Sequence, residues 1–196
     1  HERVLLQGAL GSGKTILFRA LAGLWTTGEG RIVMPERGRV HYLPTHAYVP
    51  PGLLADAICY PHPPRDFGLP AIAEALEAVG LGHLGAQLSS SDRWDQLLSS
   101  GERQCIAFAR VLLERPDWLV TDDALMRLDP DQQLRVIALL KGPLADVGIL
   151  GIGNGGERRN TPQFPVIPVD DRPRRPARIG VFEHVVDRVE IILTAR

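Results

Sequence analysis

The chain has 196 residues, of which 44% are hydrophobic and 23% charged, and its formal net charge is -1. These values are typical of one soluble globular domain, and a charge this close to neutral argues against broad contact with nucleic acid. Two cysteines, Cys59 and Cys105, are too few for a disulfide framework or a zinc site, and no run of about 18 apolar residues predicts a membrane span.

The first predicted elements are a strand, a glycine-rich loop and a helix. Val4–Leu6 is a short apolar run, and the apolar residues of 15–22 recur at helical spacing. The loop between them matches the pattern G-x-x-x-x-G-K-[ST], with the residues Gly8, Ala9, Leu10, Gly11, Ser12, Gly13, Lys14 and Thr15. A glycine-rich turn before a helix is the alternative interpretation. The flanking strand and helix favour a phosphate-binding loop, and Lys14 stands out because Lys141 is the only other lysine.

Loops of this kind bind phosphate because glycines let successive backbone N–H groups point inward at the start of a helix. Lys14 would reach the β- and γ-phosphates, and the Thr15 hydroxyl would be a ligand of Mg²⁺. Asp122 follows the apolar strand 118–121 and would supply a second magnesium ligand. By itself, an acidic residue in this place could equally cap a helix.

The rest of the chain alternates strands and helices, which predicts a largely parallel sheet covered on both faces. A turn-rich stretch is expected at 48–64, and 155–178 is expected to be an irregular, flexible loop rich in proline and arginine. Its arginines could contact lipid or nucleic acid, but a solvated loop is favoured. Strands are predicted at 39–43, 118–121, 147–152 and 185–193, and helices at 71–79, 131–140 and from Ser99 or Ser100 to 113.

Leu98–Gln104 (L-S-S-G-E-R-Q) resembles the signature segment of ATP-binding cassette (ABC) proteins, usually written LSGGQ. Met126–Asp129 resembles the D-loop of that family, which includes Asp129. The resemblance implies an α/β P-loop NTPase fold with a largely parallel sheet, a helical signature subdomain, and an amino-terminal β part that would precede His1. The whole chain, 1–196, would be one nucleotide-binding domain, with 1–45 and 114–196 as ATPase core and 46–113 as Q-loop and helical signature region.

Within the family, four short segments are most similar to the peroxisomal fatty-acyl half-transporters and to the bacterial uptake and export proteins that share their cassette type. These segments are Leu21–Trp25, Gly28–Gly30, Tyr42–Pro44 and Tyr60–Pro61.

The family implies that two cassettes close head to tail, so that each ATP lies between one phosphate loop and the signature segment of the other cassette. Ser99, Ser100, Gly101 and Glu102 would then contact the partner's ATP, which is consistent with an anion site at a helix start. Without the other motifs, these residues would be interpreted as an ordinary capped helix start.

Three positions depart from the family pattern. Leu43–Tyr48 aligns with the Q-loop, where Thr45 replaces the glutamine that touches Mg²⁺, and the adjacent His46 is interpreted as a surface histidine. Asp123 replaces the glutamate that orients the attacking water, and Asn154 replaces the switch histidine. Lys14, Asp123 and Asn154 are the predicted catalytic residues, and the three replacements leave open how fast ATP is hydrolysed.

The leading hypothesis is an ATPase that uses ATP and Mg²⁺ to drive transport. Its expected partners are a second nucleotide-binding domain and a transmembrane domain in the same polypeptide, because the sequence begins with His1 and reads as an excerpt. The expected location is the cytoplasmic face of the bacterial inner membrane, or of the peroxisomal membrane. A degenerate cassette that binds ATP for regulation or scaffolding and a soluble ATPase of DNA or translation are the alternatives.

Overall fold

The computed structural model describes residues 3–8, 11–27, 29–33, 39–153, 166–168 and 190–194. The chain forms two compact units, each assembled from separate stretches of sequence. The first unit comprises His1–Tyr42, Asp117–Asp123 and Gly148–Arg196, and the second comprises Leu43–Pro116 and Ala124–Val147.

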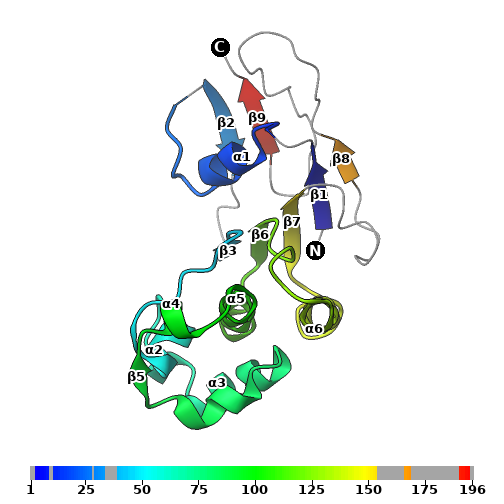
Figure 1. Ribbon diagram of the computed structural model, residues 1–196. Coiled ribbons are helices and arrows are strands. Elements are labelled where there is room, and N and C mark those ends of the chain that lie inside the picture. The colour runs from blue at the N-terminus through cyan, green and yellow to red at the C-terminus, as the bar shows by residue number, and fades with distance from the viewer. Residues whose placement is uncertain are drawn as a thin grey trace. The chain divides into compact units, whose positions relative to one another are not determined.

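A five-stranded sheet is the centre of the first unit (Figure 1). Its strands occur in the order β3-β6-β7-β1-β8, and the pairs β6–β7, β7–β1 and β1–β8 are parallel. They span Arg3–Gln7 (β1), Val40–Leu43 (β3), Trp118–Asp122 (β6), Gly148–Gly153 (β7) and Val166–Pro168 (β8). The predicted α/β fold with a largely parallel sheet is confirmed.

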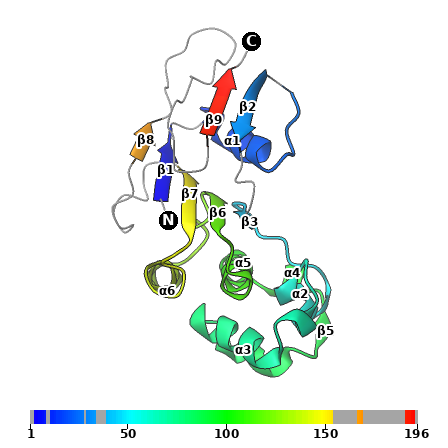
Figure 2. The same cartoon turned by 180° about the vertical axis from the view of Figure 1, so that it is seen from behind.

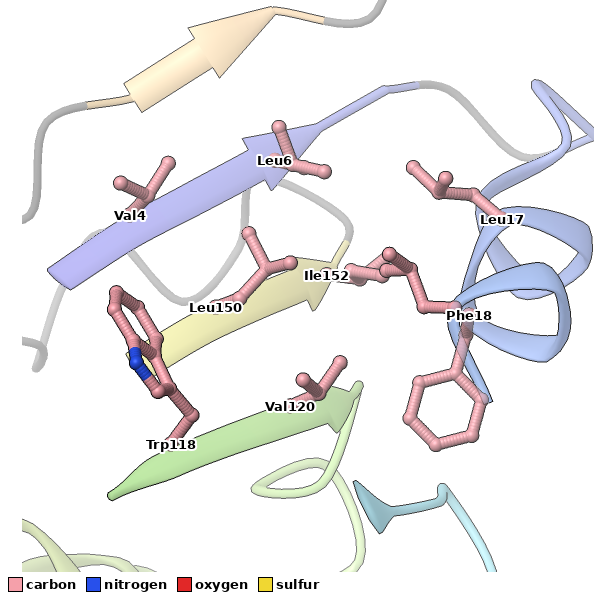
Figure 3. Close-up of a cluster of buried hydrophobic side chains, with 9 residues drawn as sticks. Val4, Leu6, Leu17, Phe18, Trp118, Val120, Leu150 and Ile152 are labelled. Carbon is pink, nitrogen blue, oxygen red and sulfur yellow. The ribbon is translucent and has the colours of Figure 1, made fainter. Parts of the chain in front are cut away.

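The helix α1 (Lys14–Leu21) covers one face of this sheet. Figure 3 shows Leu17 and Phe18 of α1 on the side of the sheet that carries Leu6, Val120 and Ile152. Alternate residues of each strand point to the same face of the sheet, which gathers these apolar side chains under α1. Their burial removes apolar surface from water and stabilises the unit. The buried members of the cluster are Val4, Leu6, Leu17, Phe18, Leu21, Trp118, Val120, Leu150 and Ile152.

A separate antiparallel pair in the first unit joins β2 (Glu29–Val33) to β9 (Glu190–Thr194). The sequence predicted the closing strand close to its observed place but did not predict β2. Val166–Pro168 of β8 lies within 155–178, where an irregular loop was expected, and there the structure differs from the expectation. Pairing with the edge of β1 accounts for this strand, because an unpaired strand edge offers free backbone groups.

The second unit is mainly helical, and its helix α5 packs against α2, α3 and α6 (Figure 2). Two residues of β4 pair antiparallel with two of β5. The elements are β4 (Gly52–Leu53), α2 (Leu54–Cys59), η1 (Pro64–Asp66), α3 (Leu69–Ala78), η2 (Gly82–Gln87), β5 (Ser91–Asp92), α4 (Trp94–Leu97), α5 (Ser100–Glu114) and α6 (Pro130–Lys141).

The helix α2 lies inside the stretch 48–64, which was expected to be turn-rich. A helix of six residues is not stable by itself, but most of the residues of α2 are buried. Packing against the rest of the unit therefore stabilises a helix where the prolines predicted turns. The predicted helices at 71–79, 99–113 and 131–140 are present within one or two residues at each end. Among the helices of the described residues, none combines the length and apolar character needed to cross a bilayer.

Candidate functional site

The loop after β1 has the backbone conformation that a phosphate-binding loop needs. Gly11 and Gly13 have φ values of +85° and +87°, in the left-handed region where a β-carbon is strained. A β-carbon built at either glycine meets no heavy atom within 4 Å, so the backbone, and not a shortage of space, favours glycine. Gly13 is the N-cap of α1, and its carbonyl accepts the first helical bond, from the Leu17 N–H.

Lys14 is the first residue of α1, and its side chain folds back over this loop. The Lys14 Nζ donates to the carbonyl oxygen of Gly8 at 2.6 Å and lies 3.4 Å from the Ser12 hydroxyl. Only 7% of the residue is exposed, which is rare for lysine. A fixed ammonium group beside the start of a helix favours binding of a polyanion such as a triphosphate.

The sheet register places Asp122 at the same edge as the loop. Gln7, the last residue of β1, pairs with Gly153 of β7, and Asp122, the last residue of β6, pairs with Ile152. One strand therefore separates the two strand ends, or about 10 Å of sheet. Asp122 is 3% exposed, so it is buried at the sheet edge from which the phosphate loop continues.

Asp123 turns the chain out of β6. Its φ of +46° lies in the left-handed region, and its backbone N–H donates to the carbonyl of Ile152 at 2.8 Å. Aspartate tolerates this conformation better than longer side chains because its short carboxylate can bond locally. The half-buried carboxylate of Asp123 follows directly after Asp122 at this sheet edge.

The residues present fit Mg²⁺ bound together with a nucleotide. Asp122 and the exposed Thr15 supply a carboxylate and a hydroxyl, the oxygen ligands that Mg²⁺ prefers. Within the described residues, no group of three or more His, Cys, Asp or Glu gathers as a ready-made metal site. Phosphate oxygens would therefore complete the coordination, as they do in many nucleotide sites.

In the second unit, the signature segment starts the helix α5 with a complete capping box. Ser99, and not Ser100, is the N-cap: its hydroxyl accepts from the Glu102 N–H at 3.2 Å. The Glu102 carboxylate accepts from the Ser99 N–H at 2.8 Å, and it lies 3.9 Å from His83. The N–H groups of Ser100 and Gly101 belong to the first turn of the helix, where backbone N–H groups have no acceptor within the helix.

The D-loop packs against the same helix start at Gly101. A β-carbon there would lie 2.7 Å from the Gln132 side-chain oxygen and 3.2 Å from the Arg127 carbonyl. That Gln132 oxygen accepts from the N–H of Asp129, the N-cap of α6, whose carboxylate accepts from the Gln132 N–H. The starts of α5 and α6 therefore share one close contact, which a β-carbon at position 101 would crowd.

Thr45 lies in the second unit and lines a pocket of about 220 Å³. Next to it, His46 Nε2 contacts the Arg127 guanidinium and must accept, because guanidinium has only donors. His46 is exposed, as the interpretation of a surface histidine expects, and the contact with Arg127 was not predicted. The pocket wall comprises Thr45, His46, Ala47, Tyr48, Val49, Asp95, Ser100, Arg103 and Arg127.

The structure brings the predicted site residues together in two groups. Gly8, Gly11–Thr15, Asp122 and Asp123 belong to the first unit, whereas Thr45, Ser99–Glu102 and Asp129 belong to the second. Ala9, Leu10 and Asn154 lie outside the described residues.

Comparison with known proteins decides the family. The model of the ABC transporter family matches residues 1–126, which include the phosphate loop, the signature segment and Asp122. The chain belongs to the ABC transporter family. It is an ATP-binding domain of that family, and it is called the cassette below.

Named relatives lie on the predicted branch. The cassette is 36% identical over 151 residues to an uncharacterized ABC transporter ATP-binding protein of Haemophilus influenzae, which covers 77% of this chain and 25% of that protein. It is also 36% identical to the inner membrane ABC transporter ATP-binding protein YddA of Escherichia coli (75% and 26% covered) and to human ATP-binding cassette sub-family D member 3 (65% and 21% covered). The predicted resemblance to the bacterial and half-transporter branch is confirmed.

A solved structure supports the fold. A bacterial Atm1-family ABC exporter with ATP bound matches with a TM-score of 0.63 at 18% identity, over 78% of this chain and 29% of the exporter chain. The cassette spans about a quarter of the length of the curated relatives it matches.

Two buried polar residues of α5 were not predicted as part of the site. Gln104 is fully buried, and Arg110 is 7% exposed. Each bonds to backbone carbonyls more than fifty residues earlier in the chain. The available signal was a glutamine and an arginine flanking the apolar run 105–109, because such residues are rarely buried without partners.

Proposed function

We propose that the cassette binds Mg-ATP at the phosphate loop and, paired head to tail with a second cassette, hydrolyses it to drive transport through a membrane domain. The observation that carries the proposal is the common sheet edge of the phosphate loop and Asp122, set by the register of β1, β7 and β6. The family match supports ATP binding, and the pairing and the transport rest on the family mechanism.

Each residue of the first unit has a distinct role in this proposal. The N–H groups of 11–15 and the Lys14 ammonium bind the phosphate oxygens. Thr15 and Asp122 hold Mg²⁺, which when bound neutralises charge on the β- and γ-phosphates. Asp123 orients the attacking water and accepts its proton.

In the second unit, the start of α5 binds the γ-phosphate of the partner cassette's ATP. The N–H groups of Ser100 and Gly101 belong to the first turn of α5, and the helix dipole favours an anion at a helix start. The Ser99 hydroxyl still has its proton to donate, because in the capping box it only accepts. The Glu102 carboxylate keeps Ser99 in place by bonding its N–H.

The two lysines of the chain provide a matched test. Lys14→Ala removes the ammonium group over the loop, whereas Lys141→Ala removes an exposed one at the end of α6. We expect Mg-ATP affinity to fall at least tenfold in Lys14→Ala, since a charge-assisted hydrogen bond contributes about 1.5–3 kcal/mol. Lys141→Ala should bind as the wild type does. Equal affinity in Lys14→Ala and the wild type would refute the phosphate loop.

A slow cassette that binds ATP for regulation is the second candidate, and Asp123 favours it. Its carboxylate is one methylene shorter than the glutamate of the family, and its backbone is held to β7 and cannot readily advance. Misplacing a catalytic group by about 1 Å can cost on the order of a hundredfold in rate. Asp123→Glu should therefore raise the turnover of the full-length protein. A wild-type turnover of about 1–100 per second would exclude this candidate.

We also propose that the cassette lies at the cytoplasmic face of a membrane, joined in one polypeptide to a transmembrane domain. The name of the Escherichia coli relative, an inner membrane protein, supports a bacterial inner membrane, and the half-transporter branch keeps a peroxisomal membrane as the alternative. Fractionation of cells that express the full-length protein tests this location. Recovery in the soluble fraction would contradict it.

A further inference from the structure

The helix α5 carries two buried polar side chains whose bonds reach the Q-loop segment, Leu43–Tyr48. The Gln104 side-chain amide donates to the carbonyl of Pro44 at 3.2 Å, and Arg110 Nη1 donates to the carbonyl of Tyr48 at 2.8 Å. Thr45 lies between these two carbonyls. Both ends of the segment that contains Thr45 are therefore bonded to the signature helix.

Arg110 also holds the end of α2. Its Nε and Nη2 donate to the carbonyls of Ile58 and Ala57, at 3.1 and 2.6 Å. These carbonyls belong to the last turn of α2, where helix carbonyls have no partner within the helix. One guanidinium thus connects the last turn of α2, the Q-loop segment and α5. Burial lowers the pKa of Arg110 to about 10, so this connection has a desolvation cost.

Burial of the Gln104 side chain also has a desolvation cost. It is 0% exposed, and its side-chain oxygen has no hydrogen-bond partner among the described residues. A buried acceptor without a partner destabilises the fold, and an apolar side chain of similar size would avoid that cost. Within the described part of the chain, the bond to Pro44 is the one hydrogen bond that the Gln104 side chain makes.

We propose that Gln104 and Arg110 are positioning residues that make the Q-loop segment move with the signature helix. The catalytic consequence rests on the proposed function: Thr45 of one ATP site and Ser99 of the other are then set by one rigid element. The Q-loop segment forms one wall of the pocket beside Thr45, and Ser100 and Arg103 of α5 form another.

Hydrogen exchange in the full-length protein tests the positioning without any need for activity. Gln104→Met keeps a similar volume and removes the amide donor. We expect amides of 45–48 to exchange about fivefold faster, which corresponds to one lost hydrogen bond, while amides inside α5 keep their rates. The matched control is Ile137→Val, a core change on α6 that leaves both bonds intact. Unchanged exchange at 45–48 in Gln104→Met would overturn the proposal.

Arg110→Lys provides the second variant. A single ammonium cannot reach all three carbonyls in the planar geometry of guanidinium, so we expect faster exchange at both 45–48 and 57–60. The double variant should show faster amide exchange at 45–48 than either single variant. Acceleration confined to α2 would contradict a hold on the Q-loop segment.

A double-mutant cycle separates positioning from stability. If Gln104 acts through Thr45, Gln104→Met should change KM for Mg-ATP or kcat at least threefold in the wild-type background and have no further effect in Thr45→Ala. Additive effects would overturn the proposal. If the wild type binds no nucleotide, the proposed function fails, and the exchange rates still decide whether Gln104 holds the segment.

Discussion

The contact between the starts of α5 and α6 decides whether alanine at position 101 stabilises or destabilises the protein. Gly101→Ala adds one methyl group in the first turn of α5. By helix propensity alone, alanine should stabilise a helix by up to about 1 kcal/mol relative to glycine. By the packing, the new carbon would lie 2.7 Å from the Gln132 side-chain oxygen and 3.2 Å from the Arg127 carbonyl.

The Gln132 side chain can move, but only by giving up its bond to the Asp129 N–H. Loss of that half of the capping box costs about 1 kcal/mol. The Arg127 carbonyl belongs to the backbone and yields less readily, so the strain there adds about 1 kcal/mol. After the gain in propensity is subtracted, Gly101→Ala should destabilise the protein by about 1 kcal/mol.

Thermal unfolding, followed by circular dichroism, should show a fall of about 2–4 °C in the Tm of Gly101→Ala. In a protein that already carries Gln132→Ala, the clashing oxygen is absent, and Gly101→Ala should leave the Tm almost unchanged. An increase in Tm in the wild-type background would refute the steric argument, since propensity would then dominate. Equal effects in both backgrounds would show that Gln132 does not take part.

Three further predictions concern stability. Gly148→Ala would place a β-carbon 2.6 Å from the Trp118 ring, so we expect a loss of about 1–3 kcal/mol in urea unfolding together with a changed tryptophan emission. Gly13→Ala forces a β-carbon into a left-handed residue and should cost about 1–2 kcal/mol, seen as a lower Tm. Burial raises the pKa of Cys59 to about 11 and of Cys105 to about 12, above the usual value of 9. The unfolded thiols therefore release protons first, and unfolding free energy should fall by about 1–2 kcal/mol between pH 8 and 9.5. Alanine at both cysteines should remove most of this slope, and an unchanged slope would contradict the burial argument.

Elements with local signals were predicted well. The helix α5 begins with a capping box and has apolar residues at helical spacing, and the strands β1, β6 and β7 are continuous apolar runs. Elements that depend on distant partners were missed. The helix α2 has six residues and is stabilised by burial, and β8 pairs with β1, which is more than 150 residues earlier.

The sequence by itself predicted the glycine loop between a strand and a helix, because its determinants are neighbours in the chain: the glycines that have positive φ, the strand before them and the helix that begins at Lys14. It also determined that Asp122 ends an apolar strand. Only the tertiary structure decided that this strand end lies one strand away from the loop, since the register of β6, β7 and β1 joins distant segments. Likewise, only the fold shows that Gln104 bonds to Pro44, sixty residues away, because burial and hydrogen bonding there depend on packing between helices and loops.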